Sequence, residues 1–263
     1  MGGSVLGSPV KSAMPNPFLS ADGAARYAAG RPDVQPLVLE RVKPFLTGTA
    51  LGVDVACGSG QCSVALADLV IEVRAYDISP EMLSRARPHP RVTYALSPAE
   101  ALPLPDHCAD AMTVFMAFHW FERGAFLHEA RRVLKPDGVL AICNSWFAGE
   151  LVGKAEFAGV WQTYLERYPS AERDRRPFDE AEARQAGFSL HSERFTHLVE
   201  LNREQLIAYF LTQSNTIAAT DAERETPEQV QVWLNEKLAP LMPEGEVGEF
   251  VFGAEIRVLT RLG

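Results

Sequence analysis

The chain has few cysteines, and their spacing would not hold a metal. Cys57, Cys62, Cys108 and Cys143 form no Cys-x-x-Cys pair and fall mostly in or beside apolar segments. This pattern predicts neither a disulfide framework nor a zinc site. We therefore expect reduced thiols, a cytoplasmic location and no bound metal.

Long apolar runs and an excess of basic residues are also missing. No segment approaches the roughly 20 continuous apolar residues of a membrane-spanning helix. Residues 1–17 are rich in Gly, Ser and Pro and lack the basic and apolar regions of a signal peptide. The formal net charge of -9 argues against a basic face for nucleic acid. We expect a soluble monomer or homodimer with a small-molecule substrate and no membrane or nucleic-acid partner.

The residues that are present predict one α/β domain. Hydrophobic residues make up 47% of the 263 residues, which is enough for a full core. Short apolar runs alternate with segments of helical spacing, so a mainly parallel sheet with helices on both faces is predicted. We expect a flexible arm at 1–17 and a single domain over 18–263, with its core at 33–146 and helical insertions at about 147–187 and 200–245.

The alternation also predicts individual elements. Apolar runs predict strands at 51–55, 72–76, 91–95, 110–116 and 139–143, and near the C-terminus at 189–198 and 248–262, where the last two would pair and complete the sheet edge. Helical spacing predicts helices at 33–46, 80–86, 122–134, 151–168 and 202–212.

A glycine loop follows the first predicted strand, at the sheet edge where open α/β folds bind ligands. Residues 58–63, together with Asp77 further on, resemble a dinucleotide fingerprint, so NAD is one candidate ligand. Asp54 just before the loop, and the absence of Lys and Arg from 51 through 73, favour a cationic ligand without phosphate. A helix N-terminus holds phosphate without side chains, so both ligands stay open at this point.

Asp77 ends the second predicted strand, within reach of the same crevice. A carboxylate there accepts hydrogen bonds from both hydroxyls of a ribose. The alternative role is an N-cap, which Ser79 before Pro80 would fill better. We favour the ribose role.

Four ordered motifs between Tyr27 and Cys143 resemble the class I S-adenosylmethionine-dependent methyltransferases, in particular the type 11 group. They are DVACGSG at 54–60, YDISPEML at 76–83, AEALPLP at 99–105 and RVLKPDG at 132–138. The resemblance implies a Rossmann-like, doubly wound, mainly parallel seven-stranded sheet with an antiparallel edge strand. It also implies S-adenosylmethionine as the cofactor. Residues 208–214 look like the late helix beside the acceptor pocket of trans-aconitate and farnesoate methyltransferases.

The same resemblance implies contacts with each part of the cofactor. Asp54, Gly58 and Gly60 would lie on the methionyl side, Asp77 at the ribose, Ile78 and Met82 on the adenine face, Ala99 and Glu100 at the adenine edge, Met116 and Ala117 at the methionine portion, and Tyr27 and Arg31 over the pocket. Arg31 would pair with the methionyl carboxylate or with an acidic acceptor. Ala56 stands where the family usually has its first loop glycine, and its extra methyl group is tolerable where φ is negative.

His119 follows the fourth predicted strand, on the side where the methyl group would be presented. A base helps when the acceptor is a hydroxyl and is unnecessary for an ionised carboxylate. A structural histidine that holds the loop or caps the next helix is the alternative reading. The sequence thus predicts methyl transfer to a small carboxylic acid or a phenolic or hydroxyl metabolite. The alternatives are an NAD-dependent oxidoreductase, and a non-catalytic cofactor-binding protein of the same fold.

Overall fold

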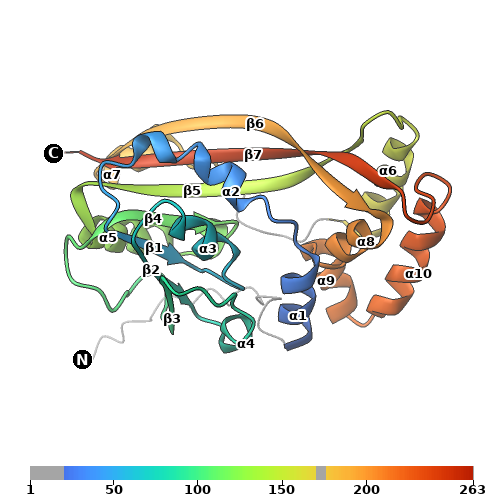
Figure 1. Cartoon of the computed structure of the whole chain (residues 1–263), viewed down its shortest axis with the longest axis horizontal. Coiled ribbons are helices and arrows are strands. Elements are labelled where there is room, and N and C mark those ends of the chain that lie inside the picture. Colours follow the sequence, from blue (N-terminus) through green and yellow to red (C-terminus); the bar gives the residue numbers. More distant parts are fainter. Residues whose placement is uncertain (1–20, 170–175, 263) are drawn as a thin grey trace, which may run out of the picture.

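Seven strands form one sheet in the order β3-β2-β1-β4-β5-β7-β6 (Figure 1). The computed structural model describes residues 21–169 and 176–262, so the arm predicted at 1–17 lies outside the described residues. The strands are β1 (Leu51–Val55), β2 (Glu72–Asp77), β3 (Val92–Leu96), β4 (Ala109–Phe115), β5 (Leu134–Leu151), β6 (Phe188–Asn202) and β7 (Val247–Arg261).

The first five strands are parallel and bring the ends of distant segments to one edge. β1 pairs with β2 on one side and with β4 on the other, β2 pairs with β3, and β4 pairs with β5. β1 and β4 are largely buried on both faces and are apolar apart from Asp54, Asp110 and Thr113, as expected for a parallel sheet covered by helices. The loops that follow β1, β2 and β4 therefore meet at the carboxyl edge, as the predicted fold class requires.

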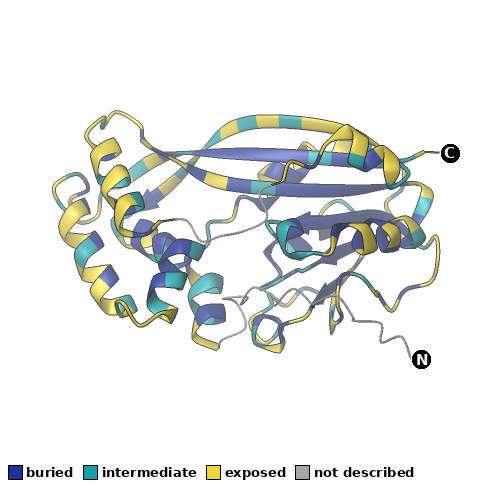
Figure 2. Ribbon diagram, turned by 180° about the vertical axis from the view of Figure 1, so that it is seen from behind, coloured by how far each residue is buried: buried dark blue, intermediate teal, exposed yellow. Residues whose placement is uncertain are grey.

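The two C-terminal strands extend the sheet. β7 runs antiparallel to β5 and lies between β5 and β6, so the antiparallel strand stands one place inside the edge that β6 forms. The predicted pairing of the two C-terminal strands is confirmed. Figure 2 shows β7 buried over most of its length, whereas β6 alternates between exposed and half-buried residues.

Helices cover both faces of the sheet. Side chains of α2 and α3 pack on one face, and side chains of α5 and α7 pack on the other. The alternation of strands and helices in the sequence thus predicts the layers correctly. These helices are α2 (Gln35–Glu40), α3 (Gln61–Ala67), α5 (Arg123–Val133) and α7 (Glu180–Gln185), with the short α4 (Pro80–Leu83) at the end of β2.

A second group of helices packs beyond the sheet, around the far ends of β5 and β7. Their core is aromatic: the rings of Trp161, Tyr164 and Phe210 stack with centroids 4.6–5.7 Å apart. We call this group the helical cap, and Figure 1 shows it at the opposite end of the molecule from the C-terminus. Its helices are α6 (Phe157–Arg167), α8 (Arg203–Leu211), α9 (Ser214–Asp221) and α10 (Pro227–Leu238). The helix α1 (Ala21–Gly30) packs against α8 and α4.

Several predicted elements differ in extent from those observed. The helix expected at 33–46 ends at Glu40 and is followed by a 3-10 turn, η2 (Lys43–Phe45), since Pro44 has no N–H to continue the helical ladder. β5 runs to Leu151, well beyond the apolar run, because pairing with β7 satisfies its backbone along this length. As a result α6 begins at Phe157 instead of 151.

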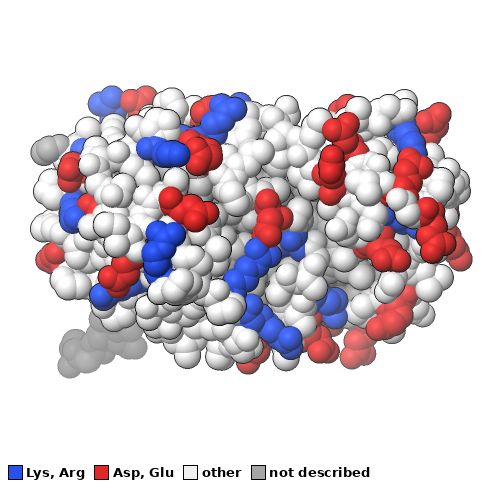
Figure 3. Space-filling view, viewed as in Figure 1, with Lys and Arg blue, Asp and Glu red and all other residues white. Residues whose placement is uncertain are grey.

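On the face in Figure 3, aspartate and glutamate are spread over the surface, and several lysine and arginine side chains adjoin one another near the lower middle of the view. Among the described residues, no helix combines the length and apolarity needed to cross a bilayer.

Candidate active site

A cavity of about 240 Å³ opens at the carboxyl edge of the sheet, where the loops after β1, β2 and β4 meet α1 and the α8–α9 link. Most of the site residues predicted from sequence line this one cavity. The predicted residues in its wall are Tyr27, Arg31, Ala56, Gly58, Asp77, Ile78, Met82, Ala99, Glu100, Met116, Ala117 and His119.

Asp77 joins the ends of two strands. Its carboxylate accepts one hydrogen bond from the Gly58 N–H at 2.8 Å and another from the Ser79 N–H at 2.9 Å. Burial raises the pKa of the Asp77 carboxyl, and the N–H groups of Ser79 and Gly58 act against that rise. A carboxylate has about four acceptor positions, so it retains capacity to accept from ligand hydroxyls. Ser79 caps α4, since its Oγ accepts from the Met82 N–H at 3.2 Å, as predicted.

The glycine loop packs too closely for side chains. Gly58 has φ +55°, and a Cβ there would lie 2.9 Å from the Cε of Met82. Gly60 has φ +80° at the start of α3, and a Cβ there would lie 2.3 Å from the hydroxyl oxygen of Tyr94. The positive φ favours glycine at both positions, and at Gly60 the Tyr94 ring also leaves no room for a Cβ, whereas the Met82 methyl group near Gly58 is the movable end of a side chain.

Ala56 adopts a left-handed conformation, with φ +55°. The expectation of a negative φ at this position is wrong, because the loop turns sharply straight after β1. Met116, at the corresponding place after β4, has φ +59°. Such a conformation costs a non-glycine residue about 1–2 kcal/mol. The two strained residues lie at neighbouring strand ends, and both line the cavity.

Asp54 lies beneath the loop, outside the cavity wall. It is fully buried, and its two oxygens accept from the Ser63 Oγ at 2.6 Å and from the Thr113 Oγ1 at 2.8 Å. Burial raises the pKa of Asp54 to about 6, although these hydrogen bonds lower it. The carboxylate thus ties β1 to α3 and β4 and supports the loop from below. Gly60 is the other predicted contact outside the cavity wall.

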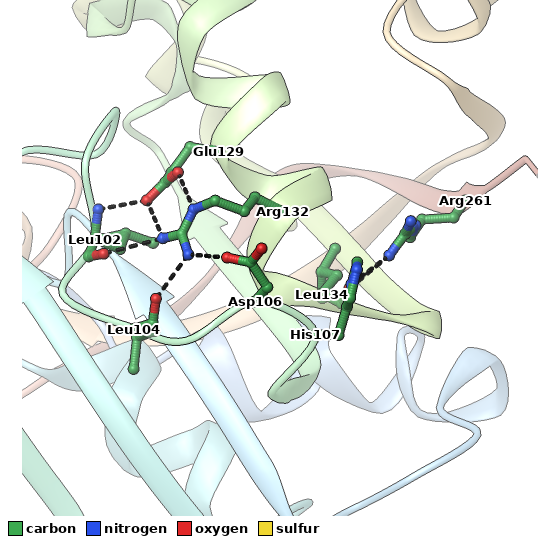
Figure 4. A network of polar contacts seen from close by, with 8 residues as sticks. All are labelled: Leu102, Leu104, Asp106, His107, Glu129, Arg132, Leu134 and Arg261. Carbon is green, nitrogen blue, oxygen red and sulfur yellow. Dashed lines mark hydrogen bonds and ion pairs between the residues drawn. The ribbon is translucent and has the colours of Figure 1, made fainter.

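The loop that carries Ala99 and Glu100 is fastened by a polar network (Figure 4). Arg132 of α5 donates to the carbonyl oxygens of Leu104 at 2.7 Å and Leu102 at 3.1 Å. Glu129 accepts from the Leu102 N–H at 2.6 Å and forms an ion pair with Arg132, which lowers the pKa of the Glu129 carboxyl. In the sequence, the motif at 132–138 indicates the resemblance but no role for its residues. The structure shows that Arg132 of this motif holds the backbone of the loop at Leu102 and Leu104.

The loop after β4 forms another part of the cavity wall. His119 lies in a 3-10 turn, η3 (Phe118–Trp120), and its ring centroid is 4.8 Å from that of Trp120. His119, Trp120 and Phe121 all line the cavity. Phe118 anchors the turn by edge contact with Phe178, at 5.2 Å between centroids. His119 is therefore held in the cavity wall beside large apolar rings.

The helical cap and α1 complete the wall. The Arg31 Nη2 donates to the Thr212 carbonyl at 3.0 Å, and its guanidinium lies 4.9 Å from the Tyr27 ring and 5.3 Å from the Tyr209 ring. The Tyr209 side chain is itself buried in the core of the helical cap. Several lining residues were not anticipated, because isolated polar residues far apart in the sequence give no signal: Gln35, Gln61, Gln213 and Ser214.

The part of the chain that the structure describes contains no group of three or more His, Cys, Asp or Glu side chains placed to hold a metal ion. All four cysteines carry free thiols. Cys57 and Cys62 line the cavity, and burial raises the pKa of both thiols. They are therefore protonated at neutral pH and contribute to packing.

Comparison with known proteins identifies the domain. Residues 53–142 match a family model described as a methyltransferase domain. A solved structure named as a type II methyltransferase, from Anaeromyxobacter dehalogenans, has a TM-score of 0.66 and 25% sequence identity, and the match covers 86% of this chain and 95% of that chain. Residues 53–142 thus match a methyltransferase domain, and the fold as a whole is similar to that of a solved methyltransferase.

Sequence relatives agree with this identification. An uncharacterized methyltransferase of Mycobacterium tuberculosis is 35% identical over 126 residues, which are 48% of this chain and 50% of that protein. Malonyl-acyl-carrier-protein O-methyltransferase of Dechloromonas aromatica is 34% identical over 122 residues, or 45% of this chain and 40% of that protein. The chain spans about half the length of the curated relatives it matches. The family model covers residues 53–142, and the helical cap lies outside those residues.

Proposed function

We propose that this protein transfers the methyl group of S-adenosylmethionine to a small molecule, which is a carboxylic acid or a phenolic or hydroxyl metabolite. One observation carries the proposal: a single cavity is lined by the glycine loop with Asp77, and also by His119 and Trp120. The first set suits a nucleoside with a methionine tail, and the second suits an acceptor. Cofactor and acceptor would therefore meet in one space.

The cavity wall offers a place for each part of the cofactor. We assign Asp77 to the ribose hydroxyls, Met82 and Ile78 to the adenine faces, and Ala99 with Glu100 to the adenine edge. Met82 is buried and Ile78 is exposed, so the adenine would lie against one fixed and one outer apolar side chain. Gly58 lets the ligand approach the backbone closely. Met116 and Ala117 would contact the methionine portion.

When bound, the cofactor supplies a methyl group on a positively charged sulfur that is open to in-line displacement. The protein accelerates such a reaction mainly by orienting the acceptor and excluding water. Trp120 and Phe121 provide apolar surface for both tasks. His119 would accept the proton of a hydroxyl acceptor, and it would position a carboxylate acceptor, which needs no base.

A relative supports the carboxylate choice. The name of the malonyl-acyl-carrier-protein O-methyltransferase states O-methylation of a malonyl group, whose free end is a carboxylate. The finer resemblance to trans-aconitate and farnesoate methyltransferases points in the same direction and stays a prediction. The monomeric or dimeric state and the cytoplasmic location also stay predictions.

The proposal is tested by two measurements on the same preparation. Calorimetric titration with S-adenosylmethionine, S-adenosylhomocysteine and NAD should give binding of the two sulfur nucleosides and none of NAD. A panel of carboxylic acids and phenols should then yield S-adenosylhomocysteine and a product heavier by one methylene. NAD binding alone would favour an oxidoreductase, and cofactor binding without turnover on any acceptor would favour a non-catalytic binding protein.

A further inference from the structure

The edge strand β6 leaves one side of its backbone open. Among the described residues, β7 is its only neighbour in the sheet, and β6 is the outermost strand in Figures 1 and 2. Its 15 residues exceed the usual strand length of about 5–6. Proteins commonly protect a sheet edge with proline, lysine or a bulge. Residues 188–202 contain neither proline nor lysine, and their register with β7 is continuous. This edge can therefore accept another strand.

The two faces of β6 differ in exposure. Side chains at the odd positions from 193 to 199 are half-buried on the face beside α2, where Arg41 contacts Glu193 and Phe195. Side chains at the even positions from 192 to 200 are exposed on the opposite face. The formally charged residues of β6 are Glu193, Arg194 and Glu200. Of these, only Arg194 and Glu200 carry opposite charges on the same face.

Glu200 faces other acidic side chains. It lies directly opposite Glu249 of β7, and both residues are exposed. Glu150 of β5 pairs with Val251, two positions along β7 from Glu249 and therefore on the same face. Like charges opposite each other in a sheet are destabilising. Among the described residues, none forms an ion pair or a hydrogen bond with the Glu200 side chain. A positive charge on the open side of β6 would therefore stabilise Glu200.

Arg194 can supply such a charge to a second molecule. Its Nε donates to the Glu255 Oε1 at 2.8 Å, and Glu255 also forms an ion pair with Arg257 at 2.8 Å. Glu255 is thus shared by two guanidinium groups. The Arg194 side chain is 74% exposed, and only its Nε donates a hydrogen bond to a described residue. A guanidinium has five N–H donors, so Arg194 retains the capacity to bind a second carboxylate.

We propose that two copies of this protein form a homodimer by antiparallel pairing of β6 with β6 of the second copy. Twofold symmetry pairs residue i with residue j and also j with i, so each register is centred on one residue. The register centred on His197 places Arg194 opposite Glu200 of the second copy, and symmetry repeats this pair. Of the symmetric registers, this is the one that pairs opposite formal charges. Burial lowers the pKa of His197, so the two imidazoles at the axis are uncharged at neutral pH.

The same register covers exposed apolar side chains. Leu198 is 51% exposed, and Trp146 of β5 is 43% exposed. Trp146 lies over Gly253, because a Cβ there would be 2.4 Å from the Trp146 Cε2, and Gly253 pairs with Thr196 of β6. In the register centred on His197, Thr196 lies opposite Leu198 of the second copy. Leu198 of each copy is thereby covered on its open side.

Charge-reversal variants test both the pairing and its register. Sedimentation equilibrium of the wild-type protein should give the mass of two chains. Glu200→Arg and Arg194→Glu each place like charges opposite each other twice, so each should weaken dimerisation about tenfold or more. In an equal mixture of these two variants, both cross-strand pairs again carry opposite charges, and a heterodimer should form with about the wild-type affinity. Glu236→Arg, at an exposed position of α10, is the matched control and should remain dimeric.

Three outcomes overturn the dimer. The first is a wild-type protein that sediments as a single chain up to about 100 µM, well above a micromolar dissociation constant. The second is a Glu200→Arg variant that dimerises as well as wild type. The third is a mixture of the two variants that stays monomeric. If Arg194→Glu failed to fold without its Glu255 contact, the comparison of Glu200→Arg with Glu236→Arg would still decide the pairing.

The dimer does not depend on the proposed function. No described residue of β6 lines the cavity, so each variant should bind S-adenosylhomocysteine as wild type does, and this binding also shows that the variant is folded. If neither wild type nor variants bound this ligand, the proposed function would fail. The sedimentation result would still decide the dimer, with circular dichroism as the measure of folding.

Discussion

The Asp77 carboxylate accepts a hydrogen bond from the Gly58 N–H at 2.8 Å, which joins the end of β2 to the glycine loop after β1. The two residues are 19 positions apart in the sequence and adjacent in the cavity wall. Because Asp77 both shapes the loop and faces the cavity, its loss removes a support and a ligand contact together. This relationship leads to the first prediction.

Asp77→Ala should weaken cofactor binding by about 1.5–3 kcal/mol or more, the net worth of a charge-assisted hydrogen bond. Calorimetry with S-adenosylhomocysteine measures it. Asp68→Ala is the control, because its side chain is 73% exposed at the end of α3. Unchanged affinity in Asp77→Ala would remove Asp77 from the ligand site.

His119→Ala should leave cofactor affinity nearly intact and lower turnover, since His119 lies on the acceptor side of the wall. The comparison is kcat with a hydroxyl acceptor against the dissociation constant of S-adenosylhomocysteine. His128→Ala, on the exposed face of α5, should change neither value. A collapse of cofactor binding would mean that His119 holds the loop in place and does not act on the acceptor.

Ala56→Gly should stabilise the protein by about 0.5–1 kcal/mol. The substitution relieves a left-handed alanine, worth about 1–2 kcal/mol, and glycine offsets part of that by its greater freedom in the unfolded chain. Urea unfolding measures the change. Ala222→Gly is the control, because φ there is −81°, and it should be neutral or destabilising. Destabilisation by Ala56→Gly would show that the turn does not strain this residue.

Asp54→Asn should flatten the dependence of stability on pH. The raised pKa means that the native state binds more protons than the unfolded chain between the ordinary value of 3.8 and about 6. Stability from this group is therefore present at low pH and falls by about 3 kcal/mol as pH rises through that window. The measurement is the free energy of unfolding between about pH 4 and pH 6, the range set by the two pKa values. The values for wild type and variant should diverge across this range. If the unfolding free energies of wild type and variant changed with pH in parallel, the raised pKa of Asp54 in the native state would be contradicted.

The candidate site was predicted from sequence where the signal is local. Asp77 follows a strand, the glycine loop follows another, and the order of strands and helices alone brings both to the carboxyl edge. Asp54 was predicted to contact the methionyl side of the cofactor, but its carboxylate is buried beneath the loop, where it is held by Ser63 and Thr113 from two other elements. Its distance from the cavity was therefore beyond sequence reasoning.

The sequence by itself determined the alternating architecture, the glycine loop and its acidic partner, because these depend on residue type at short spacing. Only the tertiary structure decided the positive φ of Ala56, the position of β7 inside the sheet edge, and the meeting of Arg31, Gln35 and Gln213. Of these three residues, Arg31 and Gln213 are the farthest apart in the sequence, with 182 positions between their numbers. Their meeting depends on the packing of α1 against α8, which periodicity in one segment does not encode.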